Sequence, residues 1–158
     1  MVGETDYMVG LLIQALKDNG LYDNTVIVAY ADHYLYTIND KTVLDKYKDT
    51  QGSLINNTPF FIWSSDIKSQ SVNKVTMQMN ILPTVLNLFG IDYNSNYYLG
   101  TNALSPKYKG LAYFSDYSWY DGNVYVENGE VVNGKKISKK KLEETSDKVN
   151  KLFRKNDL

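Results

Sequence analysis

The chain has no cysteine and a single histidine among its 158 residues. The lack of cysteine excludes disulfide bonds and thiolate metal sites. No apolar run reaches the length of a membrane-spanning helix, and the amino terminus lacks the charged-then-apolar pattern of a signal peptide, so we expect the chain as given to be soluble. The formal net charge is only −1, which gives no general attraction to nucleic acid or to an anionic membrane. No nucleic-acid partner is therefore expected.

What is present suggests one core of ordinary domain size, because 43% of the residues are hydrophobic. The run Thr25–Ala31 is apolar without polar alternation, and it ends in Asp32 and His33. Such a run predicts a strand covered on both faces, as in the parallel sheet of an α/β protein. Ligands in these folds gather at the carboxyl ends of the strands, which is where Asp32 and His33 lie.

Three further elements surround this strand. Residues 6–19 have apolar side chains at helical spacing, with Thr5 or Asp6 as candidate caps and Gly20 as the stop. A short helix is expected at about 42–48. Residues 58–63 predict a second strand that begins at a proline, and residues 80–90 a helix capped by Asn80 and ended by Gly90. The expected buried stripe of that helix consists of Leu82, Val85, Leu86 and Phe89.

From residue 109 the pattern changes to short β-prone runs at 111–119, 123–127 and 130–132. The dipeptides at 121–122 and 128–129 are strong hairpin signals, and Asn133-Gly134 closes the third run. These signals predict a small antiparallel meander. Ser138 then caps an expected final helix at about 139–154, whose apolar face is Leu142, Val149, Leu152 and Phe153.

Asp32 and His33 together offer an anionic oxygen and an imidazole nitrogen, which suit a divalent metal. The alternative is a strand-end Asp that caps a neighbouring helix beside a structural histidine, and the dipeptide alone favours this reading. The strand context improves the case for a metal. Two ligands make an incomplete site, since zinc sites need at least three. Nothing in the spacing of Asp40, Asp45 and Asp49 selects one of them as the third.

Other chemistries have less support. There is no glycine-rich phosphate loop, and no nucleophile-elbow pattern accompanies the histidine. An anionic polymer or lipid headgroups could contact the lysines at 135–136 and 139–141, but acidic residues follow directly and favour a solvated helix start. The aromatic run of Tyr113, Phe114, Tyr117, Trp119 and Tyr120 could line a sugar or lipid groove, although packing of the meander is the simpler account.

The order of the motifs resembles the carboxy-terminal third of the sulfatase branch of the alkaline phosphatase superfamily. Within it, the chain is most similar to the lipoteichoic acid synthase group of phosphoglycerol transferases, best over residues 4–105. The motifs, in order, are a helix, GLYDNTVIV at 20–28, the pair Asp32-His33, NTPFFI at 57–62 and ILPTVLNLFGI at 81–91.

The resemblance implies a metal-dependent enzyme. Such enzymes use a nucleophile beside a divalent metal, and they transfer glycerol phosphate from phosphatidylglycerol to a growing polymer. The resemblance makes Asp32 and His33 metal ligands and puts Tyr34 next to the substrate. Mn²⁺ or Mg²⁺ is the expected metal, with Zn²⁺ or Ca²⁺ as alternatives. The nucleophile and the remaining ligands would lie upstream, so no catalytic nucleophile is expected in this segment.

The predicted fold is therefore α/β: the C-terminal part of an alkaline-phosphatase-like sheet flanked by helices, with the meander and the terminal helix. We expect residues 1–158 to form a single domain, a fragment of a larger catalytic domain, with an αβ core at 1–105, the meander at 106–137 and the helix at 138–158. The parent would lie at the extracellular face of the cell membrane.

The expected partners are a phospholipid-derived or anionic polymer substrate, the upstream part of the same domain and an edge-mediated homodimer. The isolated chain should be inactive. Alternatives within the superfamily are a phosphodiesterase, a phosphoethanolamine transferase or a sulfatase. An alternative of another class is a non-catalytic binding module for an anionic cell-wall polymer.

Overall fold

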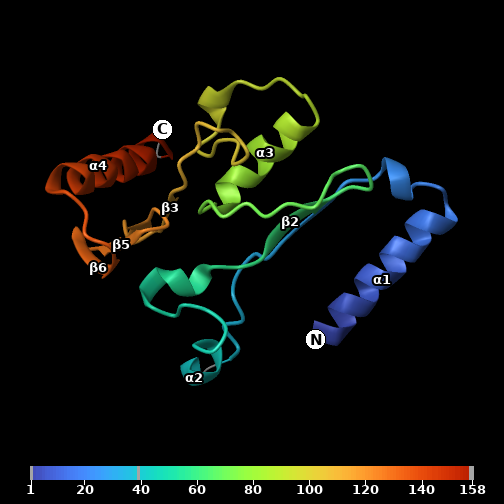
Figure 1. The fold of residues 1–158 in the computed structure, drawn as a ribbon, viewed down its shortest axis with the longest axis horizontal. Helices are drawn as coiled ribbons and strands as arrows, with labels where there is room; N and C mark the ends of the chain where they lie inside the picture. The colour runs from blue at the N-terminus through green and yellow to red at the C-terminus, as the bar shows by residue number, and fades with distance from the viewer. Residues whose placement is uncertain (1, 39, 157–158) are drawn as a thin grey trace. The chain divides into compact units, whose positions relative to one another are not determined.

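The computed structural model describes residues 2–38 and 40–156. The chain divides into two compact units, Met1–Gln70 and Ser71–Leu158. Figure 1 shows helices in both units and strands paired in small sheets. The predicted mixed α/β class, with a meander and a terminal helix, is confirmed; the single-domain organisation stays a prediction.

The first unit opens with helix α1, Val2–Asp18, which ends as predicted at Gly20. Gly20 has a φ of 66°, and the amides of Gly20 and Leu21 donate to the carbonyls of Lys17 and Leu16, a pattern that satisfies the last carbonyls of the helix. The predicted start was wrong. The helix begins at Val2, so Thr5 and Asp6 lie inside it and not at its N-cap position.

Strand β1, Ile27–Tyr30, pairs with β2, Phe60–Trp63, in a two-stranded antiparallel sheet with Ile27 opposite Trp63. The prediction that β1 lies in a parallel sheet was therefore wrong. No residue of either strand is fully buried, and Tyr30 and Phe61 are each 56% exposed. An apolar run without alternation predicts apolar faces but carries no information about the direction of the partner strand. Pro59 immediately precedes β2, as predicted.

Between the two strands lie helix α2, Lys41–Leu44, and a 3₁₀ turn, Gly52–Asn56. The predicted short helix exists but is shorter than expected. Leu44 and Leu54, one from each element, are the buried apolar side chains of this described segment. The loop after His33 therefore has a small hydrophobic centre of its own.

The first α-helix of the second unit is α3, Ile81–Leu88, which is followed at its C-terminal end by Gly90 with a φ of 64°, as predicted. Its expected buried stripe was wrong, because Leu82 and Phe89 are more than half exposed, whereas Pro83 and Thr84 are buried. Hydrogen bonds of Thr84 explain why this face is the buried one. The Thr84 hydroxyl donates to the Asn80 carbonyl at 2.6 Å and accepts from the Ala103 amide at 2.9 Å, so the loop around residue 103 covers this face.

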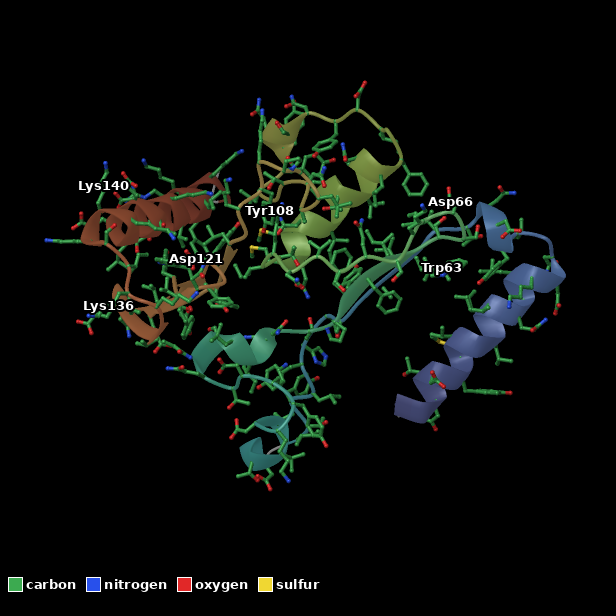
Figure 2. All side chains as sticks on the ribbon, viewed as in Figure 1. Trp63, Asp66, Tyr108, Asp121, Lys136 and Lys140 are labelled. Carbon is green, nitrogen blue, oxygen red and sulfur yellow. The ribbon has the colours of Figure 1, made fainter. Side chains whose placement is uncertain are left out.

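Asn80 precedes α3, but its side chain does not cap that helix as predicted. Its Oδ1 instead accepts from the Met77 amide at 3.0 Å and from the Tyr108 hydroxyl at 3.1 Å, and its Nδ2 donates to the Thr101 carbonyl at 2.8 Å. Tyr108 lies beside α3 in Figure 2. A buried asparagine thus joins three separate segments of the second unit.

The meander is a four-stranded antiparallel sheet in the order β3-β4-β5-β6. Asn128 and Gly129 both have positive φ, as the predicted tight hairpin turn requires. Two expectations were wrong. The run 111–119 was expected to be one strand, but a turn in which the Phe114 amide donates to the Ser118 carbonyl divides it into two. The last strand was expected to end before Asn133-Gly134, but it continues through both residues. The strands are Ala112–Tyr113, Trp119–Tyr120, Val124–Glu127 and Glu130–Gly134.

Helix α4, Lys139–Asn156, lies along the meander (Figure 1) and is capped by Ser138, whose hydroxyl accepts from the Lys141 amide at 3.3 Å. Val149 is fully buried, and the Trp119 indole donates to the Ser146 hydroxyl at 3.1 Å. The predicted cap and apolar face are confirmed. The core cluster is Tyr113, Trp119, Val124, Val126 and Val149, with Leu142, Leu152 and Phe153 packed against it. No helix within 2–38 or 40–156 is long and apolar enough to cross a membrane.

Candidate metal site

Asp32 and His33 follow β1 after a single residue, Ala31, and their side chains lie next to each other. The Nε2 atom of His33 is 3.3 Å from Oδ2 of Asp32, and the His33 amide donates to Oδ1 of Asp32 at 2.9 Å. The hydrogen bond from the His33 amide holds the Asp32 carboxylate close to the imidazole. The His33 side chain is 47% exposed and the Asp32 side chain 83% exposed, so both are accessible from solvent.

The backbone of Tyr34 favours one tautomer of the His33 ring. Nδ1 lies 2.7 Å from the Tyr34 carbonyl oxygen. Because a carbonyl oxygen only accepts, Nδ1 must be the donor, and in the neutral ring the lone pair is then on Nε2. In that tautomer, Nε2 and a carboxylate oxygen of Asp32 lie 3.3 Å apart with no hydrogen on either atom. Two electron-rich atoms at this distance repel each other unless a cation or a proton lies between them.

This arrangement fits part of a metal site. A ligating histidine usually donates its other ring N–H to a carbonyl or carboxylate, and the Tyr34 carbonyl has this role here. The set is incomplete, because residues 2–38 and 40–156 contain no group of three or more His, Cys, Asp or Glu side chains that could hold a metal. Asp32 and His33 therefore offer two ligands.

The three loop carboxylates among which the sequence could select no third ligand accept hydrogen bonds from nearby residues of the loop. The Thr42 hydroxyl donates to Oδ1 of Asp40 at 2.6 Å and the Thr42 amide donates to the same atom at 2.9 Å, and these two hydrogen bonds lower the pKa of Asp40. The Thr50 hydroxyl donates to Asp45, and Oδ1 of Asp49 accepts from the amide of residue 51 at 2.9 Å. None of the three is brought into a metal-binding group with His33 within the described residues.

Comparison with known proteins identifies the family. A sequence model of the family described as Sulfatase matches residues 1–91, which is more than half of the chain. The chain belongs to the sulfatase family. The family resemblance predicted from the order of the motifs is confirmed.

Two curated members of this family are similar to the chain over most of its length. Lipoteichoic acid synthase 2 of Bacillus subtilis (strain 168) is 24% identical, over 91% of this chain and 24% of that protein. Lipoteichoic acid synthase of Staphylococcus aureus (strain USA300) is 31% identical, over 76% of this chain and 21% of that protein. The chain thus spans about a quarter of the length of these relatives.

Within this sulfatase-family segment, the sequence alone did not single out two residues near the site, one beside His33 and one beside Tyr34. The ring of Tyr36 lies 4.3 Å from the His33 ring, centre to centre, and 6.4 Å from the Tyr34 ring at an interplanar angle of 85°. The Lys48 ammonium lies 5.6 Å from the centre of the Tyr34 ring. Tyr36 could have been inferred from the pattern Tyr-Leu-Tyr directly after the Asp-His pair. Lys48 has no such signal, since it comes from a different part of the loop.

The lysines near the start of α4 have acidic neighbours. Lys139 and Lys140 lie 3.8 and 3.9 Å from the carboxylates one helical turn later, and Lys141 lies 2.7 Å from Asp121. Figure 2 shows Lys136 and Lys140 at the two sides of the link between the meander and α4. These ion pairs agree with the interpretation of a solvated helix start. In the aromatic run, Tyr113 and Trp119 are buried against α4, whereas Tyr117 is 57% exposed.

Proposed function

We propose that this chain is the C-terminal part of a metal-dependent phosphoglycerol transferase, similar to a lipoteichoic acid synthase, in which Asp32 and His33 are two ligands of the metal. The observation that carries the proposal is the 3.3 Å separation of Nε2 of His33 from a carboxylate oxygen of Asp32, with Nδ1 of His33 2.7 Å from the Tyr34 carbonyl oxygen. The names of the relatives supply the reaction class. The parent protein acts at the extracellular face of the cell membrane on a phospholipid-derived or anionic polymer substrate.

When bound, Mn²⁺ or Mg²⁺ neutralises charge on the phosphoryl oxygens and lowers the pKa of the attacking hydroxyl. The residues of this chain have simpler tasks. Asp32 contributes negative charge, and His33 contributes a nitrogen whose orientation is set by the proton held between Nδ1 and the Tyr34 carbonyl. The Tyr34 ring adjoins the substrate. The nucleophile and the other ligands come from the upstream part of the domain, so the isolated chain is inactive.

The same two ligands serve a phosphodiesterase, a phosphoethanolamine transferase or a sulfatase of this family. The identity of the upstream nucleophile separates these reactions: a threonine, a serine or a modified cysteine. The relatives named as lipoteichoic acid synthases favour phosphoglycerol transfer.

The test is a Mn²⁺ titration of the full 158-residue chain, followed by calorimetry and by paramagnetic broadening of the His33 ring signals in NMR. We expect weak binding, because a site with two ligands lacks half of its coordination shell. Asp32→Ala and His33→Ala should abolish it. Asp92→Ala removes an exposed carboxylate from the second unit and should leave it unchanged.

Equal Mn²⁺ binding by the wild type and both site variants would refute the assignment of Asp32 and His33. The inactivity of the isolated chain has its own test. Manganese-dependent phosphodiester turnover by this chain that His33→Ala abolishes would show that the segment carries a complete site.

A further inference from the structure

We propose that Lys48 is a positioning residue for His33, acting through Tyr34. The inference deepens the function proposed above and rests on the metal-binding role of His33. It concerns which tautomer the His33 imidazole adopts before any ion binds. Three successive contacts, all within the first unit, connect the two residues.

The first contact anchors the lysine. Its backbone amide donates to the Leu44 carbonyl at 3.0 Å, and its ammonium donates to the Asn57 carbonyl at 2.6 Å. The amide of Asn57 in turn donates to the Leu54 carbonyl at 3.0 Å. Leu44 and Leu54 are the buried apolar side chains of this segment, so both ends of Lys48 are fixed to its small hydrophobic centre.

The second contact joins Lys48 to Tyr34. The ammonium lies 5.6 Å from the centre of the ring, within the range of a cation–π interaction. Burial of the ammonium lowers the pKa of Lys48, which indicates that it has lost part of its hydration. A partly dehydrated cation gains more from an aromatic face than a fully hydrated one. The Tyr34 side chain is therefore held in place, and with it the Cα atom that carries both the ring and the adjoining carbonyl.

The third contact joins Tyr34 to His33. The Tyr34 carbonyl accepts from Nδ1 of His33 at 2.7 Å and also from the Tyr36 amide at 2.8 Å. The direction of the Tyr34 carbonyl is fixed by its hydrogen bond to the Tyr36 amide and by the contact of the Tyr34 ring with Lys48. Because the hydrogen bond from His33 keeps the proton on Nδ1, it keeps Nε2 available as a ligand. Lys48 thus supports one tautomer of a histidine that it does not touch.

The experiment compares Lys48→Met with Lys48→Arg in the full chain. Methionine keeps an unbranched apolar stem and removes the charge, whereas arginine keeps the cation and its donors. The readout is the tautomer of neutral His33, measured in the metal-free protein from the ¹⁵N shifts of the ring nitrogens. We expect Lys48→Met to lower the ratio of the Nδ1–H to the Nε2–H form by about twofold to fivefold, the range of an exposed cation–π contact. Lys48→Arg should retain the wild-type ratio.

Two further variants make the test specific. Lys46→Met removes the charge of an exposed lysine from the same segment and should change nothing. Tyr34→Leu removes the ring but keeps the carbonyl, so it should shift the tautomer as Lys48→Met does, and the double variant should shift it no further. The Tyr34→Leu variant still tests the contact between Lys48 and Tyr34 if Lys48→Met disturbs the segment around Leu44.

An unchanged tautomer in both Lys48→Met and Tyr34→Leu would overturn the inference, as would additive shifts in the double variant. A Mn²⁺ affinity that falls in parallel with the tautomer ratio would support it. The readout in the metal-free protein separates this inference from the proposed function. If the wild type binds no Mn²⁺, the metal role fails, while the tautomer series still decides whether Lys48 positions His33.

Discussion

Asp121 connects the turn between β4 and β5 to the start of α4, and its replacement by asparagine gives a sharp test of the second unit. Oδ1 of Asp121 accepts from the amides of Asn123 and Val124 at 2.9 and 3.0 Å, and Oδ2 accepts from the Lys141 ammonium at 2.7 Å. The carboxylate is 11% exposed and lies at the meander in Figure 2. One side chain therefore holds a turn and a helix together.

Asp121→Asn keeps the Oδ1 acceptor for the turn but presents an amide group to an ammonium. Loss of a hydrogen bond to a charged group costs about 1.5–3 kcal/mol. Because Lys141 is 56% exposed and is rehydrated when the bond is lost, we expect a cost around the lower limit of that range, about 1–2 kcal/mol at pH 7. Glu143→Gln is the matched control. It removes a carboxylate that is 63% exposed and 3.8 Å from Lys139, and should cost less than about 0.5 kcal/mol.

The pH dependence provides the second half of the test. Burial alone would raise the pKa of Asp121, but the hydrogen bond from Lys141, the two amides of the turn and the lysine charge outweigh burial and lower it. A lowered pKa in the folded state stabilises the protein above the pKa of the unfolded chain, about 3.9, and this contribution is lost as the pH falls through the folded-state value. The stabilities of the wild type and Asp121→Asn should therefore converge in acid.

The assay is urea unfolding in a Trp63→Phe background, in which Trp119 is the remaining tryptophan and reports on the second unit alone. A deficit for Asp121→Asn no larger than that of Glu143→Gln would refute the reasoning. A deficit that stays constant after the carboxylate is protonated would also refute it.

Two other substitutions should destabilise the second unit because they disturb its packing. Val149→Ala should cost about 2–3 kcal/mol, because it leaves a cavity at a fully buried site, and urea unfolding monitored by Trp119 fluorescence measures the loss. Gly134→Ala should cost at least about 2 kcal/mol in the same assay, since Gly134 has a φ of 104° and a Cβ atom there would lie 2.1 Å from the Asn123 carbonyl oxygen. Its control is Gly10→Ala in α1, where the added methyl meets no atom within 4 Å and should raise helicity by circular dichroism. An equal response of the two glycines would contradict this argument.

Features that depend on local chemistry could be predicted from the sequence. Gly20 and Gly90 end their helices because each adopts a positive φ that other residues reach only at a cost. The turn at 128–129 and the Ser138 cap follow from the same kind of short-range rule. Since these rules need only a few neighbouring residues, one sequence is enough to apply them.

Features that depend on distant partners could not be predicted. The apolar run of β1 gave no information about an antiparallel neighbour far along the chain, and the apolar residues of α3 did not reveal that a loop hydrogen-bonded to Thr84 covers a different face. At the candidate site, Asp32 and His33 could be chosen because they end a strand. The contribution of Lys48 depends on a loop conformation that no spacing encodes. The edge-mediated homodimer stays a prediction, and light scattering at high protein concentration tests it.

The small number of buried side chains in the first unit has a consequence for ion binding. Leu44, Leu54 and Ser64 are the buried residues that the structure describes there, so local opening of the segment after β1 exposes little apolar surface and costs little free energy. Amide hydrogens of this segment should therefore exchange with solvent much faster than those beside Val149. If the proposed ion binds Asp32 and His33 better in the closed segment than in the open one, it would stabilise the closed segment, and part of its binding energy would be used to order the loop. Slower exchange after β1 on addition of Mn²⁺ would be the direct sign of this coupling.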